Sequence, residues 1–261
     1  MTSTLAKLIA KVSRGYAEAS LIELFGVLGI PEAESSLAKV GIATSQMSEL
    51  GLKMIPPVTQ GELDSPRRIE FAESGLITVE TFREELENRE AETLELKSSL
   101  WFDHKRAAAV PNQPKSALKS EEVAHSCLKT IAAFLTSSGG NLFVGVEDKG
   151  QVLGIQHDFG CMTDDAEKQN ADGWELVLRG LIQGRFKDGV SINDYVQCTI
   201  LELDGFPVAR IKVAPRRKLS FLKQKGSDTI YALYRRQGNQ TVPVNVDQVE
   251  EFLELRRSSF E

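Results

Sequence analysis

Glu95 and Lys97 are the first residues in this sequence whose types and spacing could do chemistry. In the run 93–97 apolar and polar residues alternate, which predicts a β-strand with Glu95 and Lys97 on one face. A carboxylate beside an ammonium group suits metal-dependent phosphodiester hydrolysis, since the acid can hold the cation and the lysine can orient water or neutralise developing charge. Surface strands carry the same pair routinely, so an ion pair between Glu95 and a neighbouring cation is the alternative interpretation.

Positive charge gathers in one segment of a chain whose formal net charge is −6. Residues 60–95 hold 11 acidic and 4 basic residues, whereas residues 205–240 hold 9 basic residues and one acidic residue. Such a basic segment can hold a phosphate backbone even in an acidic protein, or it can be a solvated face. The candidate phosphate ligands are Arg210, Lys212, Arg216, Arg217, Lys218, Arg235 and Arg236.

A helix followed by a hairpin is predicted at the centre of the chain. Ser120 is a suitable N-cap, and apolar residues at helical spacing extend the helix to about Thr136. Gly139-Gly140 then ends it, because glycine adopts the positive φ that a helix C-terminus requires. The apolar run 141–146 predicts a buried strand, and residues 152–155 are expected to return beside it as a hairpin.

Further elements predict an α+β fold, a mixed β-sheet with packed helices. They are a helix over 174–182, a hairpin joining 195–203 to 206–213 around Asp204-Gly205, a strand over 230–235, and a final helix capped by Asn245. Residues 101–119 are polar and basic, contain two prolines, and are expected to form a loop.

Residues 1–75 are expected to form a small helical region preceding the main domain, residues 76–261. Apolar residues at helical spacing predict helices over 5–12 and 21–28, and Pro31 could open a third. No residue type in this region points to chemistry. Dimerisation, partner binding and packing on the main domain are the roles considered.

Several classes of protein are disfavoured by the sequence. No apolar run approaches the roughly 18 residues that span a bilayer, and the first residues start no secretory pattern, so we expect a soluble, cytoplasmic protein with no membrane partner. The three cysteines lack C-x-x-C spacing, and the three histidines lack ligand spacing, which argues against a disulfide framework or a zinc site. Gly139-Gly140 lacks the lysine ending of a Walker phosphate loop.

From about Glu90 to Arg257 the sequence resembles the Schlafen AlbA-like domain family. Four stretches carry the resemblance, in the same order and at similar spacing: Glu90 to Lys97, the Ala133-Phe134 helix end, Gly139 to Asp148, and Tyr234 to Asn239. The family's usual asparagine before the two glycines is replaced here, which puts any role of that residue in doubt. The resemblance implies a nucleic-acid-binding domain.

The resemblance also implies a nuclease site. In nuclease members, two glutamates five residues apart and an aspartate after the Gly-Val turn bind a metal ion, and the site cleaves structured RNA, notably transfer RNA. The corresponding acids are Glu90, Glu95 and Asp148, which would hold Mg²⁺ or Mn²⁺, and Lys97 matches the lysine beyond the second glutamate. In the alternative interpretation, Asp148 is an ordinary turn residue and Glu90 a solvated acid.

Three functions are therefore considered. The first is a metal-dependent endoribonuclease acting on structured RNA such as transfer RNA, with a role in stress or phage defence. It is expected to be a homodimer, because the core of the vertebrate members pairs two such domains, whereas this chain has one. The second is a non-catalytic DNA- or RNA-binding module of a regulatory or defence system, and the third is a protein-interaction component centred on residues 1–75.

Overall fold

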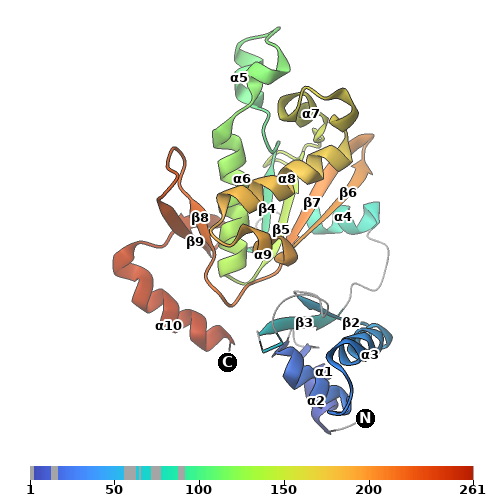
Figure 1. The fold of residues 1–261 in the computed structure, drawn as a ribbon. Helices are drawn as coiled ribbons and strands as arrows, with labels where there is room; N and C mark the ends of the chain where they lie inside the picture. The colour runs from blue at the N-terminus through green and yellow to red at the C-terminus, as the bar shows by residue number, and fades with distance from the viewer. Residues whose placement is uncertain are drawn as a thin grey trace. The chain divides into compact units, whose positions relative to one another are not determined.

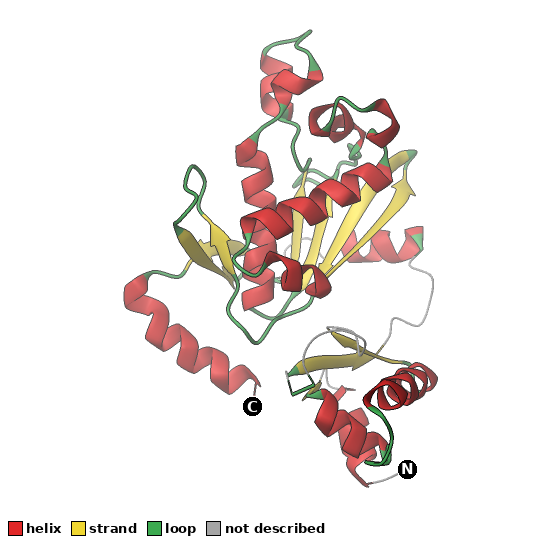
Figure 2. Cartoon of the chain, in the orientation of Figure 1, coloured by secondary structure: helices red, strands yellow, loops and turns green. Residues whose placement is uncertain are grey.

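The chain divides into two compact units, Met1–Leu76 and Ile77–Glu261, which we describe separately. The computed structural model describes residues 3–12, 17–55, 63–64, 66–71, 78–87 and 92–260. Figures 1 and 2 show the helices and strands of both units.

Unit 1 combines helices with a small antiparallel sheet. Its elements are α1 (Ser3–Val12), β1 (Ala17–Ala19), α2 (Leu21–Leu28), α3 (Ser36–Glu49), β2 (Leu52–Ile55) and β3 (Arg67–Phe71). The strand order is β1-β3-β2, and Ala17 pairs with Ile69. The expectation of a purely helical region was wrong, because these strands are short and β1 pairs with a segment far along the chain, which local periodicity cannot predict.

The helix boundaries in unit 1 follow from capping residues. Ser20 forms a capping box with Glu23 at the start of α2, and Gly29 ends this helix at a φ of 70°. The third helix does not open at Pro31 as expected. It starts after Ser35, whose hydroxyl accepts a hydrogen bond from the Ala38 amide at 3.3 Å.

Unit 2 is built on a four-stranded mixed sheet of order β4-β5-β7-β6. These strands are β4 (Leu94–Lys97), β5 (Gly140–Val144), β6 (Val196–Leu203) and β7 (Phe206–Val213). β4 and β5 are parallel, and the remaining pairs are antiparallel. A second, antiparallel sheet has the order β10-β9-β8, from β8 (Phe221–Lys223), β9 (Tyr231–Gln237) and β10 (Gln240–Pro243). The predicted α+β class with a mixed sheet is confirmed.

Helices cover both faces of the four-stranded sheet (Figure 1). On one face the core includes side chains of α6 (Glu121–Thr136) and α8 (Ala171–Arg185). On the other face α4 (Val79–Glu87) places Phe82 edge-on to Phe143 of β5, with ring centroids 5.3 Å apart. The sheet is therefore buried on both sides, and β5 reads as a continuous apolar run for that reason.

The predicted central helix is confirmed as α6, but the hairpin expected after it is reduced to a short antiparallel return beyond the end of β5. Both edges of β5 are already paired, with β4 on one side and β7 on the other. Residues 152–155 return beside the chain that follows β5: Val146 and Val152 form an isolated antiparallel bridge, and the amides of Leu153 and Gly154 donate to the Gly145 carbonyl oxygen at 2.8 and 2.9 Å. Gly139 has a φ of 82°, in agreement with its predicted role in ending the helix region.

The second predicted hairpin is confirmed as β6–β7. Asp204 and Gly205 have φ values of 54° and 81°, the left-handed conformations that a tight two-residue hairpin turn requires. The Asn245 side chain makes no capping hydrogen bond, and a short 3₁₀ turn precedes the last helix. The remaining elements are α5 (His104–Ala109), η1 (Lys115–Leu118), α7 (Gln156–Met162), η2 (Ala166–Lys168), α9 (Gly189–Ile192), η3 (Asn193–Tyr195), η4 (Val246–Gln248) and α10 (Val249–Phe260).

Candidate functional site

Glu95 and Lys97 lie on one face of β4, as their spacing predicts. They are opposite Leu142 and Val144 of β5 and therefore point to the α6 side of the sheet. The Lys97 ammonium nitrogen lies 2.5 Å from Oε1 of Glu95, and both side chains are about one fifth exposed. The first carboxylate oxygen of Glu95 is thus already paired with a cation.

Arg236 occupies the second oxygen of Glu95. Its Nη1 lies 2.8 Å from Oε2, and its side chain is only 1% exposed. The same guanidinium donates to the carbonyl oxygens of Glu92 at 3.0 Å and Leu94 at 3.3 Å, and it lies over the ring of Phe134. Arg236 therefore joins β9 to β4, and the Glu95 carboxylate stabilises a nearly buried guanidinium.

Asp148 lies on an exposed turn after β5. The amides of Gly145 and Val146 both donate to the Lys97 carbonyl oxygen, at 2.8 and 3.1 Å. These bonds hold the chain that leads into the turn against the end of β4. The turn that carries Asp148 is thus anchored to the strand that carries Glu95.

The described residues do not form a fitting site for Mg²⁺ or Mn²⁺. The two Glu95 oxygens already contact cationic groups, which would repel a divalent ion at the same carboxylate. Glu90, the third expected ligand, lies outside the described residues. Among those that are described, no group of three His, Cys, Asp or Glu residues could hold a metal ion.

The seven candidate phosphate ligands do not share one surface. Arg210 is opposite Phe143 and hence on the α4 side of the sheet, away from Glu95, where it donates to Glu85 at 2.7 and 2.8 Å. The others are placed as follows: Lys212 two residues further along β7, Arg216 and Lys218 in ion pairs with Asp188, Arg217 exposed, Arg235 over Phe252, and Arg236 on Glu95. These seven residues therefore do not form one basic surface for a phosphate backbone, and acidic residues of the unit neutralise several of them.

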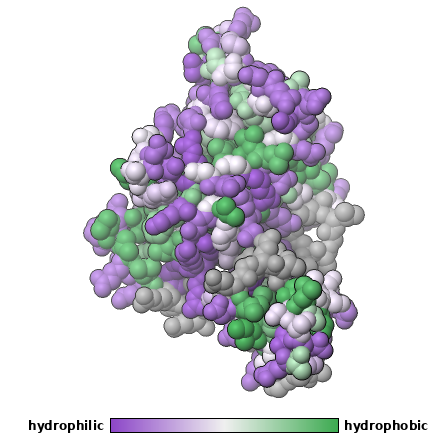
Figure 3. Space-filling view, viewed as in Figure 1, coloured by the Kyte–Doolittle hydropathy of each residue, from purple (hydrophilic) through white to green (hydrophobic). Residues whose placement is uncertain are grey.

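A different group of cations is exposed and has no acidic partner among the residues that the structure describes. We call residues 103–119 the basic arm; it contains α5 and η1, where a loop was expected. Its cations are Lys105, Arg106, Lys115 and Lys119, all exposed. None of these four forms an ion pair with an acidic residue in the part of the chain that the structure describes. Hydrophilic surface covers much of the region around α5 in Figure 3.

The basic arm is closed at its base. Phe102 and Lys119 form an antiparallel bridge, and the Asp103 amide donates to the Leu118 carbonyl oxygen at 2.9 Å. The Lys119 ammonium lies 4.4 Å from the centroid of the Trp101 ring. The two ends of the arm are thus joined to each other, in the segment that connects β4 to α6. In Figure 1, α5 lies beyond the end of α6. The sequence signal that could have found it is the run of basic residues with a single acid, Asp103.

A fully buried carboxylate supports the arm. Asp158 accepts hydrogen bonds from the amides of Leu100, Trp101 and Phe102, each at 2.8 Å, and from the Trp174 indole at 2.9 Å. The charge is therefore surrounded by donors of the kind a buried carboxylate needs. These bonds fix the chain at the point where it enters the basic arm.

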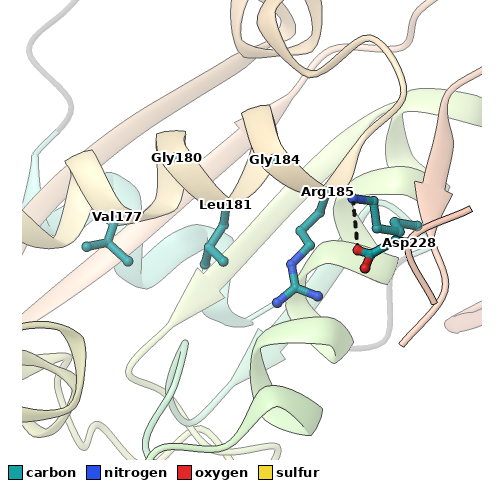
Figure 4. A pocket seen from close by; sticks show the side chains of 7 residues that line it. Val177, Gly180, Leu181, Gly184, Arg185 and Asp228 are labelled. Atoms are coloured by element: carbon teal, nitrogen blue, oxygen red, sulfur yellow. Dashed lines mark ion pairs between the residues drawn. The ribbon is translucent and has the colours of Figure 1, made fainter. Parts of the chain in front are cut away.

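A pocket of about 440 Å³ lies beside α8 (Figure 4). Val177, Gly180, Leu181 and Gly184 line one wall, and its acid, Asp228, is ion-paired with Lys223 at 3.6 Å. The lining holds no cysteine, histidine or serine. It therefore has no Ser–His or Cys–His pair, and its Lys223 and Asp228 form an ion pair with each other.

The free thiols are not candidate nucleophiles. Burial raises the pKa of Cys127 and Cys198 to about 12 and that of Cys161 to about 11. All three are therefore neutral near pH 7. His157 contacts His104, with ring centroids 5.2 Å apart, and burial followed by the charge of His104 lowers the pKa of His157.

Comparison with known proteins identifies the domain type. The sequence matches the family model described as Schlafen, AlbA_2 over residues 90–245. No curated protein matches it. In the described part of the chain, no helix has the length and apolar character needed to cross a membrane.

Two solved structures are similar over part of the chain. One is the DIP2311 protein from Corynebacterium diphtheriae, with 21% identity, a TM-score of 0.42, and 64% of this chain against 24% of that chain covered. The other is the N-terminal domain of a putative ATP-dependent DNA helicase RecG-related protein from Nitrosomonas europaea, with 18% identity, a TM-score of 0.27, and coverages of 52% and 86%. Since the family model covers more than half of the 261 residues, this chain belongs to the Schlafen AlbA_2 family.

Proposed function

We propose that unit 2 binds nucleic acid through the basic arm. The observation that supports this function is the group of four exposed cations, Lys105, Arg106, Lys115 and Lys119, without acidic partners among the described residues. Cations that are not neutralised by the protein can release the counterions of a phosphate backbone, which is the main source of affinity for nucleic acids. Membership of the Schlafen AlbA_2 family agrees with this function.

Structured RNA such as transfer RNA is the proposed ligand, with DNA as the alternative. A-form RNA is recognised mostly by shape and by contacts to the backbone. The arm offers charged side chains on α5, a helix of only 6 residues, rather than a long helix that could read bases. In this function Glu95 stabilises Arg236 and has no role in catalysis.

RNA hydrolysis with Glu90, Glu95, Asp148 and Lys97 is a second candidate function. It is favoured by the two hydrogen bonds that tie the Asp148 turn to the Lys97 carbonyl oxygen. A bound Mg²⁺ or Mn²⁺ would supply an activated water and stabilise the leaving oxygen. To bind this ion, the Glu95 carboxylate would have to give up its contact with Lys97 or with Arg236.

Binding is tested with the full chain and labelled total transfer RNA at several salt concentrations. The substitution Lys105→Glu together with Arg106→Glu is expected to weaken binding at least tenfold and to lower the dependence of log K on log salt by about one to two. The control is Lys168→Glu, since Lys168 is exposed but already paired with Asp165. Equal affinities of the double variant and the control would contradict the proposal.

Hydrolysis is tested with the same RNA and Mn²⁺, with and without chelator, beside Glu95→Gln and Asp148→Asn. Binding without cleavage in the wild-type chain is the outcome expected if Glu95 is structural. Chelator-sensitive cleavage that both substitutions abolish would establish the second candidate instead. The homodimer stays a prediction, which light scattering at micromolar concentration checks.

A further inference from the structure

Unit 1 has the topology of a winged-helix domain. Its element order is α1-β1-α2-α3-β2-β3, and its antiparallel sheet has the order β1-β3-β2. In this architecture the third helix follows a turn after the second and is presented on the surface, as in other helix-turn-helix proteins. From this topology and the surface of α3 we infer that unit 1 binds double-stranded DNA, with α3 in the major groove. The inference does not depend on the function proposed for unit 2.

The core of unit 1 uses only one side of α3. Ala43 and Met47 are buried among side chains of α1, α2 and the three strands, which form a closed cluster of their own. Gly41, Ser45 and Ser48 lie on the opposite side and are exposed. The outer side of α3 is therefore not needed to hold unit 1 together.

The chemistry of this outer side suits a close approach to base edges. Gly41, Ser45 and Ser48 are small, and a Cβ atom added at Gly41 would meet nothing within 4 Å. Serine hydroxyl groups can donate to and accept from the edges of any base pair in the major groove. A helix with small side chains can lie deep in a groove about 12 Å wide.

Charge on α3 is balanced, with its cation, Lys39, in the first half and its carboxylate, Glu49, at the C-terminal end. Glu49 is exposed and accepts a hydrogen bond from the Ser45 hydroxyl at 3.3 Å, so a contact from Ser45 to a base would replace this bond. The stretch from Ser36 to Ser48 contains no carboxylate that would repel a phosphate backbone. Exposed Lys7 and Lys11 on α1 add cations to the same unit. Asp64, in the connection between β2 and β3, is exposed and acidic, so that connection is not assigned a phosphate contact.

A protein partner fits this side of α3 less well. Leu37 is its exposed large apolar residue, at 85% exposure, and the neighbouring exposed positions carry glycine and serine. Protein interfaces concentrate aromatic and other large side chains at their centre. The described outer side of α3 has one such side chain, at its first turn, followed by small residues and, at its C-terminal end, Glu49.

The test uses the full chain and a pool of duplex DNA about three helical turns long with a randomised centre. Selection with the wild-type chain is expected to enrich a sequence motif. The variant Gly41→Glu places a carboxylate on the outer side of α3, where space is open, and is expected to lose the motif and bind the enriched duplex at least about tenfold more weakly. Ser45→Glu is expected to have the same effect.

Gly26→Glu is the matched control, because Gly26 is also a helical glycine of unit 1 with open space at its Cβ position, but lies on α2. It should retain both the motif and the affinity, and thermal unfolding should show that both glycine variants remain folded. The variant with Lys105→Glu and Arg106→Glu separates the two units: it should retain the motif even if the basic arm binds RNA. The inference is overturned if the wild-type chain enriches no motif, or if Gly41→Glu binds as well as Gly26→Glu.

Discussion

The guanidinium of Arg236 lies 2.8 Å from the carboxylate of Glu95, so a residue expected to bind phosphate and a residue expected to bind a metal ion bind each other. The ammonium nitrogen of Lys97 lies 2.5 Å from the other carboxylate oxygen of Glu95, and these three residues form what we call the Glu95 cluster. Each oxygen of Glu95 thus contacts a cationic group, and the two positive charges disfavour a divalent ion at the same carboxylate. The Glu95 cluster instead has the composition of an internal support, which links β4 to β9.

The support function predicts unequal effects of two neutralising substitutions on stability. Glu95→Gln keeps the shape of the side chain but removes the charge that faces Arg236 and Lys97, and we expect the free energy of unfolding to fall by about 1–3 kcal/mol. Asp148→Asn, on an exposed turn, should change it by less than about 0.5 kcal/mol. Urea unfolding measures both. A Glu95→Gln variant as stable as the wild type would show that the cluster is not a support.

Asp158 should be among the most sensitive acidic residues of unit 2. Asp158→Ala leaves three backbone amides and the Trp174 indole without their acceptor in a buried site, and we expect a loss of at least about 3 kcal/mol in unfolding free energy. The stability of Asp158→Asn should lie between that of the wild type and that of Asp158→Ala. The amide oxygen of asparagine can still accept hydrogen bonds, but its amide nitrogen cannot. Asp164→Ala, at a nearby exposed position, is the control and should be nearly neutral. Similar values for the two alanine variants would contradict this role of Asp158.

Two glycines of unit 2 should respond to alanine in opposite directions. A Cβ atom at Gly140 would lie 2.6 Å from the Thr93 carbonyl oxygen and from the Phe134 ring, so Gly140→Ala should destabilise the unit by about 1–3 kcal/mol. A Cβ atom at Gly184 meets nothing within 4 Å in the last turn of α8, so Gly184→Ala should stabilise it by about 0.5 kcal/mol. Thermal unfolding of the two variants compares the signs directly. If Gly140→Ala were as stable as Gly184→Ala, the close approach of β5 to Thr93 would not exist.

The parts of the fold that the sequence predicted are those whose signal is local. Helix α6 has a cap, a helical period and a glycine ending, and the Asp204-Gly205 turn has residues that tolerate positive φ. The strands of unit 1 were missed because β1 has 3 residues and pairs with β3 far along the chain. Similarly, nothing local to β5 reveals that β4 and β7 occupy both of its edges.

The candidate site was predictable only in part, for the same reason. The spacing of Glu95 and Lys97 placed them on one face of a strand, and the alternative interpretation, a pair with a neighbouring cation, describes their contact. Arg236, however, is 141 residues away from Glu95. A count of basic residues does not separate Arg210, which is paired with Glu85, from Lys105, which is exposed, because pairing depends on tertiary contacts.

His157 predicts how the stability of unit 2 depends on pH. Burial, followed by the charges of His104 and Lys115, lowers the pKa of His157 below its usual 6.5, and Asp158 opposes this shift only partly. The unfolded chain therefore binds more protons than the folded chain between the lowered pKa and 6.5, so stability should be constant above about pH 7 and fall as the pH drops through 6.5. Carboxylates contribute only at lower pH, below about 5.

The measurement is the free energy of unfolding between about pH 7.5 and pH 5.5 for the wild type, His157→Gln and His125→Gln. Burial also lowers the pKa of His125, followed by the charge of Lys129, so each substitution should flatten the pH dependence in part and the double variant should be flattest. His104→Gln removes a charge that acts on His157 and should also reduce the slope, while leaving the contribution of His125 intact. If His157→Gln showed the same slope as the wild type, His157 would take up its proton as readily in the folded as in the unfolded chain, and its packing against His104 could not be what disfavours protonation.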